Sequence, residues 1–277
     1  MSTAAGRAVM YLSNTEGYDL WSAFRRQRRV LFALMLRNMR TKFFGNGLGY
    51  LVAIAWPLSH ILILVAMYSF MGRMAPYGDS TALFIATGVV PFQTFAYLSR
   101  FMMLMLIRMR PLLAFPEVKV LDMLFASALL EIMSACCVVI AFLIIAWFAG
   151  IDPMPRDIVQ AAYALGAAVL LGLGFGLFNG VIALAFPPWF TGFMLVYILL
   201  WLSAGIIFVP DALPAQIRDI AAYQPALQLV EWMRSAYYEG YGSMVLDRGY
   251  VIGFGVMTVF LGLLLERAMR GHLLALR

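Results

Sequence analysis

Long apolar stretches, separated by short segments rich in charge or proline, dominate the pattern of hydrophobic and polar positions along this chain. A helix needs about 20 mostly apolar residues to cross a bilayer. Six stretches come close to that length, at about 48–71, 81–107, 121–148, 158–186, 190–209 and 250–265. Pro187 and Pro188 separate the fourth from the fifth and predict a sharp break in the helix. We therefore expect an all-α membrane protein with six transmembrane helices.

The segment at 21–42 has a different pattern, which predicts an amphipathic helix. One helical stripe carries the basic residues Arg26, Arg29, Arg37 and Arg40, and the opposite side carries Phe24, Leu31, Met35 and Met39. A helix of this kind lies in the cytoplasmic interface of a membrane. A simple membrane anchor and an element that contacts a cytoplasmic partner both remain open as its role.

A second segment without a span lies at about 210–248, where prolines, aromatic residues and charges of both signs occur together. Pieces such as 227–237 look helical but are too short to cross a membrane. We expect short external or re-entrant helices here, before the last span. The chain would then consist of an N-terminal cytoplasmic tail (1–20), the amphipathic helix (21–42), a six-span domain (43–270) and a C-terminal cytoplasmic tail (271–277).

Composition and charge support a membrane location. The chain is 64% hydrophobic and 12% charged, whereas soluble domains are about 45–50% apolar and about 25% charged. Lysine and arginine concentrate before the first span, between the second and third, and after the last. Under the positive-inside rule this bias places both termini in the cytoplasm. The first twenty residues include Arg7, Glu16 and Asp19 and no long apolar core, so we do not expect a cleavable signal peptide.

Motifs that would carry chemistry are missing from the sequence. A P-loop needs a lysine followed by serine or threonine, but Lys42 precedes Phe43 and Lys119 precedes Val120. The patterns G-x-S-x-G, H-E-x-x-H and C-x-x-C do not occur either. We therefore expect no catalytic residue, metal or cofactor in this chain. If ATP drives its activity, a separate subunit must bind the ATP and Mg²⁺.

Ionisable side chains inside predicted spans are candidates for function. His60, Arg100 and Glu131 are the main ones. Arg100 and Glu131 lie at similar predicted depths, so they could form a structural ion pair or line a translocation path. The fourth span also carries a stripe of small residues at a spacing of four, namely Ala168, Gly172, Gly176 and Gly180. Such a stripe favours close helix packing, within the protomer or at a dimer or sliding contact.

Two stretches resemble a known family. The first reads R-x-x-R-T-K-F-F-G-N-x-L-G-Y-L from Arg37 to Leu51, followed by W-P-L-x-H from Trp56 to His60. The second reads R-P-L-L-A-F-P-E-V-K-V-x-D from Arg110 to Asp122 and runs on to Glu131. Together they resemble the permeases of ABC-2 polysaccharide exporters, in particular the capsule-export subfamily. The resemblance extends to the tail motif G-I-I-F-V-P at 205–210 and ends near residue 241.

The resemblance implies a fold, partners and a cargo. It implies an ABC-2, type V exporter-like fold, and a homodimer that works with two cytoplasmic ATPase subunits in a Gram-negative inner membrane. It also implies periplasmic and outer-membrane capsule export components, a lipid-anchored anionic polysaccharide as cargo, surrounding membrane lipid, and no nucleic acid. The chain itself would be a permease and no enzyme.

The resemblance also assigns roles to residues. The ATPase-coupling region would contain Arg108, Arg110, Leu113, Phe115, Pro116, Glu117 and Lys119. Apart from the resemblance, the charges themselves suggest a basic rim where substrate gains access, at Arg25, Arg26, Arg29, Arg37, Arg40 and Lys42. The ionisable and aromatic residues of the predicted spans give the candidates for the translocation path, namely Tyr50, Trp56, His60, Arg100 and Glu131. The family often has a basic residue shortly before this glutamate, but Ala126, Ser127 and Ala128 stand here, which favours Arg100 as its partner.

Other interpretations remain open from the sequence alone. The cargo could be an O-antigen, a teichoic acid or a small drug-like compound within the same superfamily. A secondary transporter would more typically show inverted repeats and interrupted helices, which we do not find. A membrane-embedded glycolipid transferase would need a cluster of carboxylates or histidines at one membrane face. The only weak candidates for such a cluster are Asp211, Asp219, Glu231, Glu239 and Asp247.

Overall fold

The structure is a computed structural model that describes residues 20–42, 47–115 and 118–275. The described residues form helices, turns and loops, and they contain no strand. Pro116 and Glu117, two of the residues expected to contact an ATPase, lie outside the described residues. The backbones of Arg26, Lys42 and Tyr50 belong to helices, but their side chains also lie outside the described part.

Five helices are long and apolar enough to cross a membrane. They are α3 (Gly47–Phe70), α4 (Thr81–Arg108), α5 (Val120–Phe148), α6 (Ile158–Ala185) and α10 (Arg248–Ala275). The expected spans at about 48–71, 81–107, 121–148 and 158–186 agree closely with the first four. The last helix continues past the expected end at residue 265, where an ion pair of 2.8 Å between Glu266 and Arg270 supports the final turns.

The fifth expected span, at about 190–209, is shorter than predicted. Helix α7 (Pro188–Ser203) has 16 residues and is apolar, but it falls short of the length that a spanning helix needs. The chain leaves the helix at Gly205, whose φ of 72° is a left-handed conformation that favours glycine. The apolar run continues to Val209, so hydropathy alone could not show where the helix ends.

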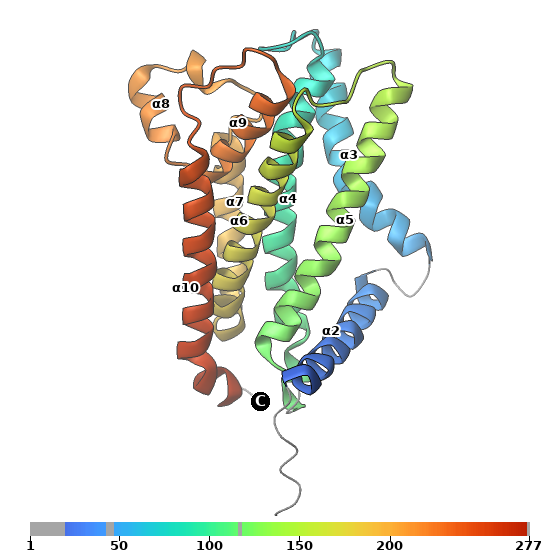
Figure 1. Cartoon of the computed structure of the whole chain (residues 1–277), viewed down its shortest axis with the longest axis vertical. Helices are drawn as coiled ribbons and strands as arrows, with labels where there is room; N and C mark the ends of the chain where they lie inside the picture. The colour runs from blue at the N-terminus through green and yellow to red at the C-terminus, as the bar shows by residue number, and fades with distance from the viewer. Residues whose placement is uncertain (1–19, 43–46, 116–117, 276–277) are drawn as a thin grey trace, which may run out of the picture.

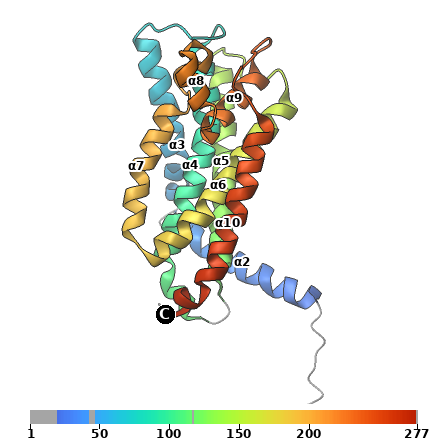
Figure 2. The same ribbon diagram turned by 90° about the vertical axis from the view of Figure 1, so that its left-hand side faces the viewer.

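The helices form one elongated bundle (Figure 1). Helix α4 packs extensively against α6, and α10 packs against the other side of α6. Helices α3 and α5 contact α4, and α7 contacts α6. Helix α2 (Leu20–Lys42) crosses one end of the bundle and packs against α5 (Figures 1 and 2). We call this the α2 end and the opposite end the α9 end.

Short elements cover the α9 end of the bundle (Figure 1). They are η2 (Pro210–Ala212), α8 (Ala215–Ala221) and α9 (Pro225–Tyr237). The prediction of a helical piece at 227–237 is confirmed by α9. Nearly all of its side chains are buried, and it packs against α4 and α6. Helix α9 is therefore part of the folded core, whereas α8 has no buried residue.

Small residues of α6 allow the close approach of its neighbours. A Cβ at Gly172 would lie 2.9 Å from a Leu98 methyl, and one at Gly176 would lie 2.5 Å from the Met102 sulfur. Both contacts are with α4 of the same chain. The predicted small-residue stripe thus packs inside the protomer, which was one of the two interpretations that the sequence left open.

The contact between α6 and α10 gives a stability prediction. Gly174→Ala should destabilise the protein by about 1–3 kcal/mol, because the new Cβ would lie 2.1 Å from the Thr258 hydroxyl and 2.9 Å from the Val259 nitrogen. Gly166→Ala is the matched control in the same helix, since no atom lies within 4 Å of a Cβ there. Thermal unfolding of both variants in detergent makes the comparison. Equal unfolding temperatures would contradict a tight contact at Gly174.

Candidate functional site

A groove with a volume of about 590 Å³ opens between α3, α4 and α7. Its lining combines aromatic and basic side chains with apolar ones. It includes His60 from α3, Gln93, Tyr97 and Arg100 from α4, and Tyr197 and Trp201 from α7. We call it the α3–α7 groove. It contains two of the ionisable residues that the sequence singled out within predicted spans.

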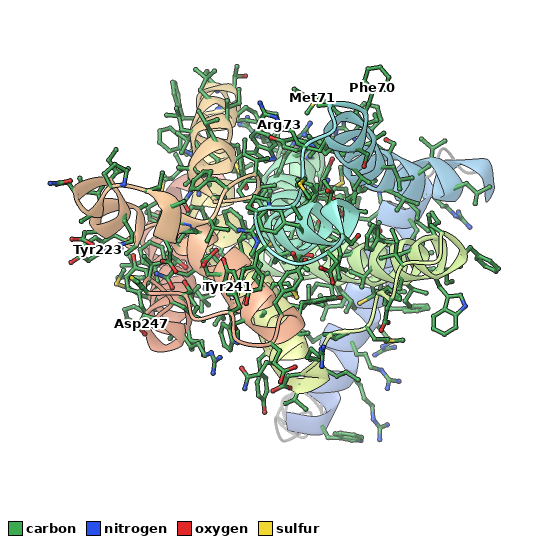
Figure 3. The ribbon with its side chains drawn as sticks, turned by 90° about the horizontal axis from the view of Figure 1, so that it is seen from above. Phe70, Met71, Arg73, Tyr223, Tyr241 and Asp247 are labelled. Atoms are coloured by element: carbon green, nitrogen blue, oxygen red, sulfur yellow. The ribbon has the colours of Figure 1, made fainter. Side chains whose placement is uncertain are left out.

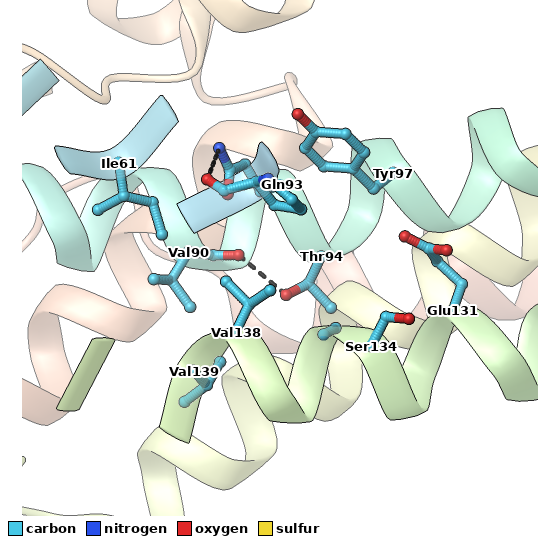
Figure 4. Close-up of a pocket in the computed structure, with 11 residues that line it drawn as sticks. Ile61, Val90, Gln93, Thr94, Tyr97, Glu131, Ser134, Val138 and Val139 are labelled. Atoms are coloured by element: carbon cyan, nitrogen blue, oxygen red, sulfur yellow. Dashed lines mark hydrogen bonds between the residues drawn. The ribbon is translucent and has the colours of Figure 1, made fainter. Parts of the chain in front are cut away.

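A smaller cavity of about 20 Å³ adjoins this groove, between α3, α4 and α5. Figure 4 shows Glu131 and Ser134 of α5 facing Thr94 and Tyr97 of α4. Gln93 and Tyr97 line both cavities, so this edge of α4 separates them. The side-chain nitrogen of Gln93 donates a hydrogen bond of 3.4 Å to the Pro57 carbonyl in α3.

The third ionisable candidate, Glu131, therefore lies on the other side of Tyr97 from Arg100. Both charged groups act electrostatically on the Tyr97 hydroxyl, and Trp56 lies beside it. Among the described parts of the chain, this arrangement brings together four of the five candidates for a translocation path. A direct ion pair between Arg100 and Glu131 stays a prediction.

The groove is held in shape by aromatic contacts at its back. Ser99 and Tyr197 share a hydrogen bond that joins α4 to α7. Phe193 packs edge-on against Tyr197, with ring centroids 5.0 Å apart. Arg100 and His60 are exposed on the open side. The groove therefore presents a cation and an imidazole on a rigid aromatic wall.

A second candidate region lies at the α2 end, where the 3₁₀-helix η1 (Arg110–Ala114) follows α4. Arg108, Phe115 and Lys119 are exposed there, and Phe115 shows 59% of its surface although it is large and apolar. Leu113 points the other way and is buried. Of the predicted coupling residues, Leu113 thus contacts the chain's own core, while Phe115 is available to a partner.

Helix α2 is joined to the same region through specific polar contacts. The Asn38 side chain donates a hydrogen bond of 3.2 Å to the Ser127 hydroxyl in α5, and Gln27 donates one to Asp122. Leu34 is buried in the cluster that also contains Leu113. These contacts make α2, η1 and the start of α5 one packed unit.

The packed face of α2 is rotated from the expected one, although it still includes Leu31. Leu34 and Asn38 are buried, whereas Met35 and Met39 are only half-buried. The hydrogen bond from Asn38 to α5 selects this face, and a hydropathy pattern does not register it. The described basic residues of the predicted rim stay exposed, namely Arg25, Arg29, Arg37 and Arg40.

At the α9 end, a buried ion pair fixes the segment that follows α7. Arg234 and Glu231 of α9 are completely buried and lie 3.3 Å apart. The Arg234 guanidinium also donates to the carbonyl oxygens of Ile206 and Phe208, at 2.8 and 2.9 Å. Tyr241 donates its hydroxyl to Glu231. This cluster explains why α7 ends at Ser203, because Arg234 donates hydrogen bonds to the backbone carbonyls that follow Gly205.

The acidic residues considered for a transferase site do not form a common site. Glu231 pairs with Arg234, and Glu239 pairs with Arg156 at 3.1 Å. Asp247 begins α10 by accepting a hydrogen bond from the Tyr250 nitrogen. Figure 3, the view onto the α9 end, shows Asp247 apart from Tyr241, the residue that donates a hydrogen bond to Glu231. Within the described chain, no group of three or more His, Cys, Asp or Glu side chains could hold a metal ion.

Known proteins match this chain over most of its length. No family model matches it. The polysialic acid transport protein KpsM of Escherichia coli is 29% identical over 246 residues, which cover 89% of this chain and 95% of KpsM. The capsule polysaccharide export inner-membrane protein CtrC of Neisseria meningitidis serogroup A is 26% identical, with 86% of this chain and 89% of CtrC covered. BexB of Haemophilus influenzae, which has the same description, is also 26% identical, with 84% and 91% covered.

The chain is a homologue of capsule-export inner-membrane proteins. The resemblance inferred from the motifs at 37–60 and 110–131 is thereby confirmed. It is an inner-membrane protein, as the resemblance implied, and its long apolar helices agree with a membrane location.

Sequence reasoning missed several groove residues in this capsule-export homologue. Gln93, Tyr97 and Arg100 follow one another at intervals of four and three, so they share one face of α4. From that spacing, Gln93 and Tyr97 could have been predicted as neighbours of Arg100 in the candidate site. Tyr197 and Trp201 of α7 repeat the same spacing and complete the aromatic wall.

Proposed function

We propose that the chain is the membrane permease subunit of an ATP-driven ABC exporter, which moves a lipid-linked capsular polysaccharide from cytoplasm to periplasm. The observation that carries the proposal is the match to capsule-export proteins over 84–89% of the chain. The names of these relatives favour a capsular cargo over an O-antigen or a teichoic acid. The scattered and individually paired acidic residues weigh against a transferase.

ATP and Mg²⁺ would bind to a separate subunit. Neither lysine of this chain stands in a P-loop, so two copies of a cytoplasmic ATPase would supply the energy. The distribution of lysine and arginine supports a cytoplasmic position for the α2 end. The exposed Phe115, with Arg108 and Lys119 beside it, would then contact the ATPase. Periplasmic and outer-membrane export components would act beyond the α9 end.

A homodimer would complete the translocation path. The open side of the α3–α7 groove lies next to exposed apolar side chains, including Trp56 and Ile63 of α3 and Leu195 and Leu199 of α7. Two copies that face each other across these helices would cover this surface and enclose Arg100 and His60. In this arrangement α7 and the turn after it would serve as the fifth of six spans.

A mechanical link between the ATPase and the path runs along α4. This helix ends at Arg108, next to η1, and carries Arg100 two turns earlier. Eight residues of α-helix span about 12 Å. A push on η1 would therefore move Arg100 and Tyr97 as one rigid body and change the width of the groove. ATP-driven closure supplies the differential contact that such a switch requires.

The basic rim of α2 gives a prediction about cargo. Arg37→Glu with Arg40→Glu should strongly reduce polysaccharide export, because these exposed residues would attract anionic groups at the inner leaflet, at about 1 kcal/mol each. The amount of ATPase that co-purifies with this variant should fall less than its polysaccharide export. The double variant with lysine at both positions keeps the charge and is the control. Normal surface polysaccharide in the glutamate variant would contradict this role.

Deletion of the gene tests the proposed function in the cell. We expect the polysaccharide to accumulate inside the cytoplasm and to disappear from the cell surface, and a plasmid copy should restore it. Immunogold labelling of sectioned cells distinguishes the two locations. Unchanged surface polysaccharide in the deletion strain would contradict the proposal, and loss of polysaccharide from both locations would point to synthesis instead of export.

A further inference from the structure

A second groove lies on another side of the bundle, between α6, α9 and α10. Its volume is about 530 Å³, within the range of about 300–1,000 Å³ that is usual for small-molecule sites. Its walls are mostly apolar or small, and include Ala162, Gly166, Leu170 and Ile252. We call it the α6–α10 groove. Figure 2 shows α10 and α7 on different flanks of the bundle, so this groove is separate from the α3–α7 groove.

Small side chains at Ala162 and Gly166 of α6 leave room for the groove. Ala162, Gly166 and Leu170 are four residues apart and share one helical face. No atom lies within 4 Å of a Cβ placed at Gly166. Further along, the two helices close up, because a Cβ at Gly255 of α10 would lie 2.9 Å from Leu170. The groove therefore opens toward the α9 end and narrows toward the middle of the bundle.

A cation with aromatic support stands at the open end. The Arg248 guanidinium lies over the Trp232 ring, 5.7 Å from its centroid. The Trp232 indole nitrogen in turn donates a hydrogen bond of 2.9 Å to the Gln160 side chain of α6. Arg248 is exposed and lines the groove. These contacts hold a positive charge at the mouth of an apolar channel.

The nearby acids are engaged elsewhere. Asp157 accepts a hydrogen bond from the Gln160 nitrogen at the start of α6, and Asp247 accepts one from the Tyr250 nitrogen at the start of α10. Within the described residues, neither forms an ion pair with Arg248. The groove therefore offers a cation to a ligand that brings its own negative charge.

The geometry points to an anionic glycerophospholipid of the surrounding membrane as the occupant of the α6–α10 groove, with its phosphate on Arg248 and one acyl chain along Gly166 and Ile252. Both α6 and α10 are long and apolar enough to cross the membrane, so lipid is the solvent of this face. Arginine binds phosphate through paired, charge-assisted hydrogen bonds. The exposed Tyr163, which lines the groove, suits the level of lipid headgroups. This inference does not depend on the exporter function.

Native mass spectrometry of the full chain in detergent tests the inference. Phosphatidylglycerol and phosphatidylcholine with identical acyl chains serve as probes. We expect the native chain to retain phosphatidylglycerol in preference to phosphatidylcholine. Arg248→Gln should lower the affinity for phosphatidylglycerol about tenfold, the loss expected for a charge-assisted contact. Gly166→Leu fills the groove and should lower the retention of both lipids.

Two matched controls separate this site from general lipid adhesion. Arg73 also lies over an aromatic ring at the α9 end, 5.8 Å from the centroid of Tyr68, but it does not line the groove. A Cβ placed at Gly253 of α10 would also have no atom within 4 Å, and Gly253 lies outside the groove lining. Arg73→Gln and Gly253→Leu should therefore leave lipid retention unchanged.

The outcomes are distinguishable. Equal retention by Arg248→Gln and the native chain would overturn the inference, as would an equal loss in Arg73→Gln. A change in subunit number caused by Gly166→Leu would also overturn it, because a second copy of the chain would then occupy the groove. If Gly166→Leu does not fold, the comparison of phosphatidylglycerol retention between Arg248→Gln and Arg73→Gln is sufficient to test the inference.

Discussion

Replacing Arg234 with methionine should destabilise the protein by about 3–5 kcal/mol, the usual cost of leaving one partner of a buried ion pair alone. Arg234 makes the buried polar contacts that hold the α9 end together. Its guanidinium pairs with Glu231, donates to two backbone carbonyls and lies 3.9 Å from the centroid of the Phe84 ring in α4. Methionine fills much of the volume but replaces none of the polar contacts. The turn after α7 and the position of α9 should both loosen.

The loss should depend on pH in a definite direction. Burial raises the pKa of the Glu231 carboxyl, and the charge of Arg234 opposes this rise. Without Arg234 the pKa should rise further, because the buried carboxylate has lost its counter-charge. Protonation at lower pH removes that uncompensated charge. The deficit relative to the native chain should therefore be larger at pH 8 than at pH 5.

Thermal unfolding in detergent at the two pH values measures both effects. Arg218→Met is the matched control, because Arg218 also pairs with an acid of its own segment, at 3.7 Å, but with the exposed Asp219. Exposed pairs contribute about 0–1 kcal/mol. If Arg234→Met were no more harmful than Arg218→Met, the buried cluster would not be what fixes the α9 end.

The second large effect concerns the contact with the ATPase. Phe115→Ala should leave the permease folded but weaken its association with the ATPase by about 2 kcal/mol, or roughly thirtyfold in affinity. Phe115 is a large exposed aromatic residue next to the basic residues Arg108 and Lys119. Aromatic side chains of this kind often anchor interfaces by filling a partner's pocket. Co-purification at graded ATPase concentration measures the change.

Leu113, two residues earlier, provides the contrast. It is 3% exposed and packs into the cluster that contains Leu34 of α2. Leu113→Ala should therefore lower the stability of the permease by about 2–5 kcal/mol through a cavity. Phe115→Ala should not change the unfolding temperature. If both variants lost stability equally, Phe115 would be a core residue and the proposed contact surface would be wrong.

Hydropathy was sufficient to predict the long helices, because each apolar run ends at charges, prolines or a capping residue. Ser80 and Asp157, for example, cap α4 and α6 through their side chains. The end of α7 was not predictable in the same way. The apolar run there continues to Val209, and the helix ends because Gly205 turns the chain and Arg234 binds the carbonyls that follow. Both causes are tertiary.

Only part of the candidate site could be predicted, because some of its residues are recognisable only from tertiary contacts. Arg100, Glu131 and His60 were found because charge within an apolar span is conspicuous. Tyr97 and Tyr197 were not, because aromatic residues are common in membrane helices and only the fold shows that these two face one groove. Leu113 is the converse case, a residue that the sequence singled out and the fold buries. Its motif suggested a contact with a partner, but packing against α2 turns it inward.

ATP hydrolysis by the purified chain, alone and together with its genetic neighbours, tests the central claim most directly. We expect no hydrolysis by this chain alone. Vanadate-sensitive hydrolysis should appear when a separate nucleotide-binding subunit co-purifies with it, and Phe115→Ala should reduce that association. Hydrolysis by the chain alone, or a purified membrane complex that contains no ATPase, would contradict its assignment as the permease of an ABC exporter.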